Sequence, residues 1–399
     1  MFSALPCLGH ALRRTVTVLV LAIVLLIAFR GMAQTEGSAA PLPAGSWRFI
    51  VSGDSRNCGD IIVPAIAAQS SLFTPSFYWH LGDLRAIYKI DEDIAFSRTS
   101  EGSRMACETY HRLAWKDFVA NQIGAFGNLP VYVGIGNHEV IPPKNEDTFK
   151  REFTDWLDQP TLRRQREADK EPAQPEPYYH WIQGGVDFIY LDNSSDCFSD
   201  QQMSWFRRRL AAAKLDAAIK SVVVGMHEAL PRSFSSSHSM GDKADEPLSL
   251  KSGSEVYAAL VEFRKTKPVY VLASHSHFFM ENIYSTPELT AKGADPLPGW
   301  IVGTAGAVRY ALPDQRPASP AKSQTDTYGY LLGTVSIDGK IQFSYQEISQ
   351  ADVPQYVWAR YPANAVLWCF EHNSINREPN APELTMRCPS QQVPTCGHP

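Results

Sequence analysis

The segment VYVGIGNHE, residues 131–139, joins a short apolar run to a turn that is rich in possible metal ligands. Its first residues are β-branched, aromatic or glycine, which predicts a buried strand. The turn that follows carries Asn137, His138 and Glu139. In α/β folds, ligands bind outside the carboxyl ends of the strands. The segment therefore predicts a strand that delivers polar side chains to a functional site.

A second apolar run, residues 269–273, ends in the same way and is followed by His275 and His277. Asn137 offers an amide oxygen and the histidines offer imidazole nitrogens. This mixed set of ligands suits borderline divalent ions such as zinc, manganese, iron or nickel. The two segments together predict a metal site.

The rest of the chain supports an α/β fold. Its 399 residues are 44% hydrophobic and 20% charged, which excludes a fibrous or disordered protein and suits one main domain with insertions. Strand-like runs cover residues 47–52, 77–81, 131–135, 186–191, 221–226 and 269–273, and helical stretches cover residues 61–68, 110–123, 200–218 and 255–265. This alternation predicts a sheet flanked by helices. Consecutive strands follow at residues 300–304, 328–337 and 341–348, the last two joined by a hairpin at Asp338 and Gly339.

Several polar segments interrupt this pattern and are expected to be surface loops. They are residues 158–176, 232–253 and 311–322. The long connection at residues 84–107 directly follows a possible ligand turn, so we expect it to shape the substrate entrance. His238 lies in the segment that follows His227 and is therefore the unassigned histidine with the best chance of reaching the site.

The N-terminus predicts export. Residues 15–29 are uncharged and apolar, lie between Arg14 and Arg30, and precede a small-x-small pattern that ends at Ala33. This is typical of a signal peptide at residues 1–33. The run is shorter than the ~20 apolar residues of a membrane span, and an uncleaved signal anchor is the alternative. Residues 34–46 read as a linker, and the protein is expected in the periplasm, outside the cell, or tethered to a membrane and facing outward.

The charge disfavours nucleic acid as a partner. Loss of the signal peptide removes three arginines and takes the net charge from −5 to about −8. Broad binding to nucleic acid normally requires a basic face. A small phosphorylated substrate is more consistent with this charge, and a membrane would be contacted only through a retained N-terminal segment. The sequence does not indicate an oligomeric state.

Six cysteines remain after the signal peptide, and an even number in an exported chain predicts disulfides. They are Cys58, Cys107, Cys197, Cys369, Cys388 and Cys396. Six cysteines allow fifteen complete pairings, so the connectivity is open. We expect some of the last three to pair locally within a C-terminal extension, residues 349–399.

Five apolar runs are followed by candidate ligands. These ligand turns are Gly53-Asp54-Ser55-Arg56, Gly82-Asp83, Gly136-Asn137-His138-Glu139, Met226-His227 and His275-Ser276-His277. Their order and residue types resemble the calcineurin-like metallophosphoesterase superfamily, whose signature is Asp-x-His, Gly-Asp, Gly-Asn-His-Asp/Glu, a lone His and Gly-His-x-His. The resemblance covers residues 47–348 and implies a two-sheet α/β/β/α sandwich in this segment.

The resemblance also implies a two-metal site that hydrolyses phosphate esters by attack of a metal-bound hydroxide. Two cations about 4 Å apart can generate hydroxide and stabilise the attacking and leaving oxygens. By this resemblance, the first ion is held by Asp54, Asp83 and His277, and the second by Asp83, Asn137, His227 and His275. The ions would be divalent, with manganese, iron, zinc and nickel as the candidates.

The same resemblance places His138 near the phosphoryl oxygen or the leaving group. An imidazole with a pKa near 6.5 suits proton transfer there. Glu139 is expected to orient the backbone or a ligand.

The chain departs from the family pattern at Arg56, where the first motif usually has a metal-binding histidine. Arginine stays protonated and cannot replace that imidazole. The related purple acid phosphatases also lack this histidine and use a tyrosine three residues after the bridging aspartate, a position that is Ala86 here, although Tyr88 is close in sequence. The first ion is therefore short of a ligand, and Arg56 could instead bind the substrate phosphate through its planar fork. Arg85 is a weaker candidate for that role.

The sequence thus predicts an exported, metal-dependent phosphoesterase. One alternative is a binding or sensing protein on the same scaffold, with a degraded first metal site and little or no turnover. Another is a membrane-tethered assembly protein whose loops are the functional surface.

Overall fold

The computed structural model describes residues 42–97, 105–235, 238–243, 247–317, 322–375, 385 and 387–389. The predicted signal peptide, most of the predicted linker and Cys396 lie outside these residues. Within the described ranges, no helix is both long enough and apolar enough to cross a membrane.

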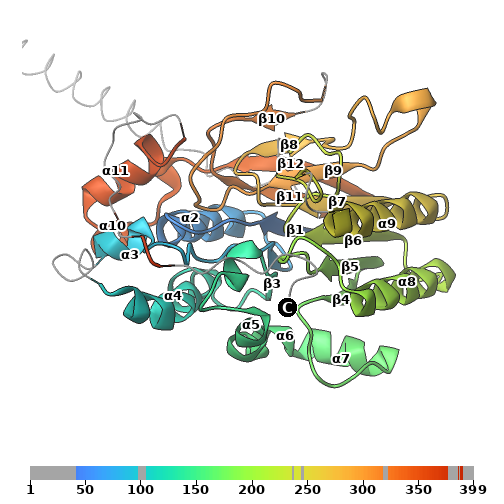
Figure 1. The fold of residues 1–399 in the computed structure, drawn as a ribbon, viewed down its shortest axis with the longest axis horizontal. Coiled ribbons are helices and arrows are strands. Elements are labelled where there is room, and N and C mark those ends of the chain that lie inside the picture. The colour runs from blue at the N-terminus through green and yellow to red at the C-terminus, as the bar shows by residue number, and fades with distance from the viewer. Residues whose placement is uncertain are drawn as a thin grey trace, which may run out of the picture. The chain divides into compact units, whose positions relative to one another are not determined.

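Two sheets form the centre of the fold (Figure 1). The first has five strands in the order β12-β11-β1-β2-β3, and β1, β2 and β3 are parallel to one another. Their bounds are β1 Trp47–Ser52, β2 Tyr78–His80, β3 Val131–Val133, β11 Gly329–Val335 and β12 Ile341–Glu347. Strands β11 and β12 form the hairpin that Asp338 and Gly339 predicted.

The second sheet has seven strands in the order β10-β8-β9-β7-β6-β5-β4. Their bounds are β4 Tyr179–Gln183, β5 Val186–Leu191, β6 Ser221–Met226, β7 Val269–Ala273, β8 Phe279–Glu281, β9 Gly299–Val302 and β10 Ser323–Gln324. Strands β5, β6, β7 and β9 are parallel neighbours. The second sheet therefore has a parallel centre and antiparallel edges, whereas in the first sheet the parallel strands lie on one side of β1 and the antiparallel hairpin β11-β12 lies on the other.

The sheets pack against each other through aromatic side chains. The ring of Phe49 on β1 lies 5.0 Å from Phe188 on β5, and Trp79 on β2 lies 5.2 Å from Trp181 on β4. Tyr132 on β3 stacks on Trp181 at 3.8 Å. Aromatic side chains bury the most apolar area per residue, so this layer contributes strongly to holding the two sheets together.

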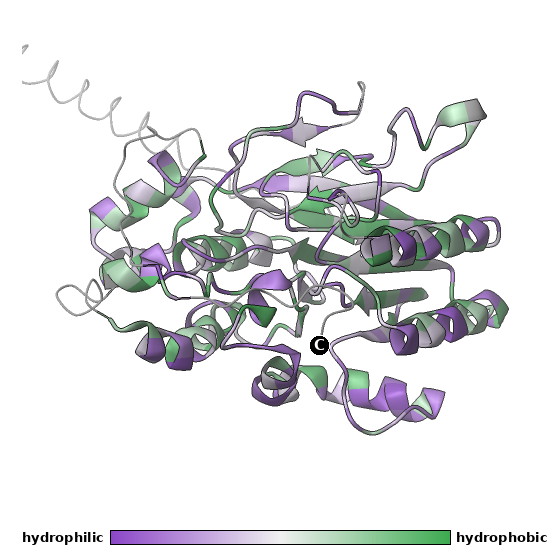
Figure 2. Cartoon of the chain, viewed as in Figure 1, coloured by the Kyte–Doolittle hydropathy of each residue, from purple (hydrophilic) through white to green (hydrophobic). Residues whose placement is uncertain are grey.

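Helices cover the outer faces, because successive strand residues point to opposite sides of a sheet. On β5, Phe188 and Tyr190 belong to the core between the sheets, whereas Ile189 and Leu191 pack with the helices α8 and α9. On the first sheet, His80 faces the other way from Trp79 and lies 5.5 Å from Phe118 of α4. Figure 2 shows the central strands as hydrophobic. The structure confirms the predicted α/β/β/α arrangement.

The predicted helical stretches match four of the helices in the described residues, α2, α4, α8 and α9, and the other helices were not predicted. Their bounds are α2 Gly59–Ser71, α3 Glu92–Ser97, α4 Cys107–Asn121, α5 Glu146–Glu152, α6 Thr154–Leu157, α7 Pro160–Asp169, α8 Asp200–Leu215, α9 Pro247–Arg264, α10 Gln355–Arg360 and α11 Ala363–Glu371.

Two of the expected loops are partly helical. Helix α7 forms within residues 158–176, and α9 begins inside residues 232–253. In α7 only Leu162 is buried and the helix is largely hydrophilic (Figure 2), so it lacks the apolar stripe by which helices are recognised. The expectation that these segments are surface loops was therefore wrong where α7 and the first turns of α9 form.

The disulfides differ from the expected local pairing of the tail. Cys369 on α11 bonds to Cys58 before α2, and Cys388 bonds to Cys107 at the start of α4. Cys197 is also disulfide-bonded. The sequence separations of 311 and 281 residues show why spacing could not predict these pairs. Both bonds fasten the C-terminal extension onto the first half of the domain.

Removing the Cys58–Cys369 bond should lower stability. Replacing both residues by alanine frees a long segment of the unfolded chain, which typically costs about 2–5 kcal/mol of unfolding free energy. Chemical denaturation of the double variant and of the oxidised parent would measure the difference. Equal midpoints and slopes for the two proteins would contradict the expected contribution of this bond.

Candidate metal centre

All five predicted ligand turns meet at one place. They follow strands whose carboxyl ends point to the same edge of their sheets, as parallel strands require. The turns supply Asp54 and Arg56 after β1, Asp83 after β2, Asn137 and His138 after β3, His227 after β6, and His275 and His277 after β7. Residues that are up to 223 positions apart in the sequence are thereby brought into contact.

Three of these residues have unusual backbone conformations. The φ angles are 59° at Asp54, 61° at Asp83 and 61° at His275. A positive φ is uncommon outside glycine, and such conformations cluster at functional sites. At Asp54 the turn is held by hydrogen bonds from its own N–H to the Gly82 carbonyl, 3.0 Å, and from the Ala307 N–H to its carbonyl, 2.9 Å. The turns therefore aim the side chains at the cost of local strain.

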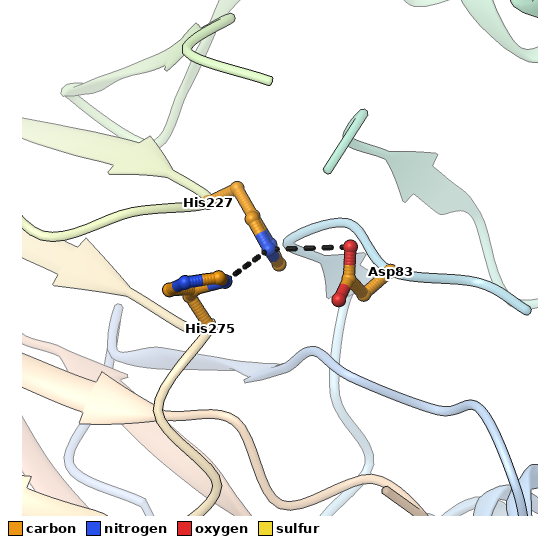
Figure 3. Close-up of side chains that lie close together, drawn as sticks. All are labelled: Asp83, His227 and His275. Atoms are coloured by element: carbon orange, nitrogen blue, oxygen red, sulfur yellow. Dashed lines mark hydrogen bonds and ion pairs between the residues drawn. The ribbon is translucent and has the colours of Figure 1, made fainter. Parts of the chain in front are cut away.

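The ligands predicted for the second ion converge on His227. Its Nε2 lies 2.9 Å from Asn137 Oδ1, 3.0 Å from His275 Nδ1 and 3.2 Å from Asp83 Oδ1. Figure 3 shows the His227 ring between His275 and Asp83. The Nδ1 of His227 donates to the Leu81 carbonyl, 3.1 Å, and burial lowers the pKa of this imidazole. Nε2 therefore carries a lone pair near neutral pH.

Asp83 is a buried carboxylate that lies between the two predicted ion positions. The residue is fully buried, and its Oδ2 has no hydrogen-bond partner among the described residues. Burial and the nearby charge of Asp54 raise the pKa of Asp83, because the carboxylate is not fully compensated. A cation bound by Asp83, Asn137, His227 and His275 would supply that compensation, and their oxygen and imidazole donors fit a divalent transition metal.

Glu139 holds the turn that carries Asp83, as expected from the sequence. Its Oε2 accepts hydrogen bonds from the N–H groups of Asp83, 2.9 Å, and Gly136, 2.8 Å, and its Oε1 accepts one from Leu84, 3.0 Å. All of these contacts are to the backbone. Glu139 therefore fixes the relative position of the β2 and β3 turns and is not available as a ligand.

Gly136 leaves the space in which these turns approach each other. A Cβ atom at this position would collide with Asp83 Oδ1 and would lie 2.9 Å from His227 Cε1. Real Cβ atoms essentially never approach other atoms this closely. Any side chain here would displace two of the proposed ligands.

The ligands predicted for the first ion surround a guanidinium group instead. The Nη2 of Arg56 lies 2.9 Å from His277 Nε2, and its Nε lies 3.4 Å from Asp83 Oδ2. Asp54 Oδ1 is 3.2 Å from the same His277 nitrogen. Arg56 is only 7% exposed. With Arg56 in this position, the residues present do not fit a metal ion between Asp54, Asp83 and His277.

His138 lies beside the ligands without joining them. Its Nδ1 donates to the Ala86 carbonyl, 2.7 Å, which directs Nε2 towards Asp83 Oδ2 at 3.5 Å. Burial and the charge of Arg56 lower the pKa of His138 well below the usual value. The imidazole is therefore neutral near pH 7, and Nε2 can accept a proton.

Aromatic residues surround the centre. The Tyr310 ring lies 4.1 Å from His277, the His238 ring lies 5.3 Å from His275, and the Tyr88 ring lies 5.4 Å from His138. The sequence pointed to His238 and Tyr88 by their proximity to ligand turns, but Tyr310 was missed. It follows the strand-like run at residues 300–304 and carries no motif.

Arg85, the weaker candidate for phosphate binding, is structural. It is fully buried and pairs with Asp60, with Asp93 at 3.0 Å and with Asp117 at 2.5 Å. A guanidinium surrounded by carboxylates in this way is not available to a substrate.

Gly136→Ala should weaken metal binding, because the added Cβ would displace Asp83 and His227. Loss of ligand orientation commonly costs about 10- to 100-fold in metal affinity. Isothermal titration of the metal-free protein with Mn²⁺ or Zn²⁺ would measure the change. Gly124→Ala is the matched control, since a Cβ there meets only ordinary contact distances. Equal affinities for both variants and the parent would contradict the proposed site.

The fold resembles that of a purple acid phosphatase of known structure. No family model matches the chain, and no curated protein sequence matches it. A purple acid phosphatase from yellow lupin (Lupinus luteus) seeds superposes with a TM-score of 0.52 and 15% identity over 77% of this chain and 53% of that one. For the structure described as PhoD the TM-score is 0.49, with 16% identity over 78% and 72% of the two chains. For a 5'-nucleotidase from Candida albicans it is 0.40, with 12% identity over 81% and 56%. The chain thus spans about half the length of the phosphatase.

Proposed function

Because the chain has the fold of the calcineurin-like metallophosphoesterases, we propose that it is an exported, metal-dependent hydrolase of small phosphate esters. The observation that carries the proposal is the convergence of Asp83 Oδ1, Asn137 Oδ1 and His275 Nδ1 on the Nε2 of His227, with both Asp83 and His227 fully buried. The bonded cysteines support export, since disulfides persist in oxidising compartments.

The four convergent residues would hold a divalent ion. Bound there, the ion would supply Lewis acidity, which polarises a phosphoryl oxygen and lowers the pKa of water. Asn137 and His275 are partly exposed, whereas Asp54, Asp83 and His277 are buried. A substrate would therefore approach from the side of Asn137 and His275.

The remaining polar groups suit phosphoryl transfer. Arg56 presents a fixed positive charge next to Asp83, and a guanidinium binds phosphoryl oxygens well. His138, whose ring is oriented by its hydrogen bond to the Ala86 carbonyl, would contact the phosphoryl oxygen or the leaving oxygen and take part in proton transfer there. Tyr88, Tyr310 and His238 would limit access of bulk water to the reacting group.

Hydrolysis should depend on metal. The purified protein is expected to hydrolyse p-nitrophenyl phosphate or its diester bis(p-nitrophenyl) phosphate, to lose this activity after dialysis against a chelator, and to regain it with Mn²⁺, Zn²⁺, Ni²⁺ or Fe²⁺. Release of nitrophenolate measures the rate. Turnover that survives the chelator, or absence of turnover with every metal, would contradict the proposal.

His138→Asn should lower kcat by about 10²- to 10⁴-fold, the usual contribution of a general acid or base. The metal content should not change, because His138 is not one of the convergent ligands. Parallel measurements of steady-state kinetics and metal content would separate the two effects. His372→Asn, at a histidine whose side chain is 62% exposed, is the control and should retain parental kinetics. A His138→Asn enzyme as fast as the parent would exclude this role.

A second candidate function is the binding of a phosphorylated ligand without turnover. The contact of Arg56 with His277 favours it, because this contact replaces a metal position by a group that cannot activate water. Tight binding of inorganic phosphate by the metal-loaded protein, with no hydrolysis in the assay above, would support this function over the enzyme.

A further inference from the structure

We propose that the guanidinium of Arg56 takes the place of one of the two metal ions, so that the working centre contains one divalent ion and one built-in organic cation. The inference rests on the proposed function in assuming that the His227 cluster binds metal. The proposed centre differs from the two-ion site that the family resemblance implied, because it holds one metal ion. It also differs from a degraded site, because the Arg56 guanidinium is present as the second cation.

The contacts of Arg56 are those expected of a bound cation. Its Nη2 lies 2.9 Å from His277 Nε2, and its Nε lies 3.4 Å from Asp83 Oδ2. These are two of the three side chains that the family pattern assigns to the first ion. The same Asp83 oxygen has no hydrogen-bond partner among the described residues, so its compensation comes from charge.

The hydrogen bonding of His277 favours a cation at this point. Its Nδ1 lies 2.7 Å from the Val308 carbonyl, which can only accept, so Nδ1 carries the proton in the neutral ring. Nε2 is then an acceptor, yet it lies 3.2 Å from Asp54 Oδ1, which is also an acceptor. The Arg56 guanidinium supplies a positive charge beside these two acceptors, through the contact of its Nη2 with His277 Nε2 at 2.9 Å.

Two hydrogen-bond donors other than Arg56 hold the Asp54 carboxylate in position. Its Oδ2 accepts hydrogen bonds from the Ser274 hydroxyl, 2.5 Å, and from the His275 N–H, 2.7 Å. Asp54 therefore links the guanidinium side of the centre to the turn that supplies His275. The two halves share Asp83 as well, whose Oδ1 faces His227 and whose Oδ2 faces Arg56.

Burial makes the guanidinium a permanent part of the centre. Arg56 is 7% exposed, and arginine remains protonated under physiological conditions. A divalent ion placed between Asp54, Asp83 and His277 would have to expel this side chain or approach its charge within a few ångströms. Unlike a metal ion, the guanidinium cannot be removed by a chelator, and it brings donors suited to a phosphoryl oxygen.

Counting metal ions tests the inference directly. The chelator-stripped protein would be equilibrated with Mn²⁺ and desalted, and manganese per chain would be determined by mass spectrometry. The wild-type protein should bind one ion per chain and show the six-line electron paramagnetic resonance signal of isolated Mn²⁺. Arg56→His, which supplies an imidazole where the guanidinium stood, should bind two ions per chain and show a spin-coupled signal.

Arg207→His is the matched control, because it exchanges an exposed arginine whose side chain is 57% accessible and adds a histidine away from the centre. It should bind one ion. Two coupled ions in the wild-type protein would overturn the inference, and so would a folded Arg56→His variant that still binds one. If the Arg56→His variant does not fold, the number of manganese ions per chain in the wild-type protein decides between one ion and two.

The hydrolysis assay on the same samples separates this inference from the proposed function. One ion per chain with no hydrolysis would support the inference and overturn the enzyme. Two ions with chelator-sensitive hydrolysis would support the enzyme and overturn the inference. A wild-type protein that binds no manganese would overturn both.

Discussion

The buried carboxylate of Asp83 is the constraint on which the centre depends. A charged group without solvent is costly unless other groups compensate it. Around Asp83 the chain places the backbone N–H of His138, which donates to Oδ1, and the guanidinium of Arg56, whose Nε lies 3.4 Å from Oδ2. Glu139 in turn holds the Asp83 backbone. Oδ1 of Asp83 faces the His227 cluster and Oδ2 faces Arg56, so this carboxylate is suited to a cation on each of its two sides.

The two-sheet architecture makes this cluster possible. Parallel strands β1, β2 and β3 end beside one another in the first sheet, and β6 and β7 do so in the second. The aromatic layer around Phe49, Trp79 and Trp181 holds the sheets face to face, so both sets of strand ends reach the same place. The packing of the aromatic layer between the sheets thus helps to set the distances between the side chains of the metal centre.

Much of the fold and of the metal centre could be predicted from the sequence, because the pattern of apolar runs and ligand turns is local. Each ligand directly follows an apolar run, and the order of Asp54, Asp83, Asn137, His227 and His275 along the chain is visible without coordinates. Helix α7 was not predictable in this way, because only Leu162 on it is buried. Nor were the partners of Cys58 and Cys107, since bonding depends on proximity across about three hundred residues.

The sequence by itself determined the α/β class, the strand ends that supply ligands and the types of those ligands, because periodicity and residue chemistry act over a few neighbouring residues. It also marked Arg56 as the departure from the family pattern. Only the tertiary structure decided what that departure means. A side chain as long as arginine can reach solvent, substrate or its neighbours from one backbone position. Its placement against Asp83 and His277 arises from contacts between turns that the folded sheets bring together.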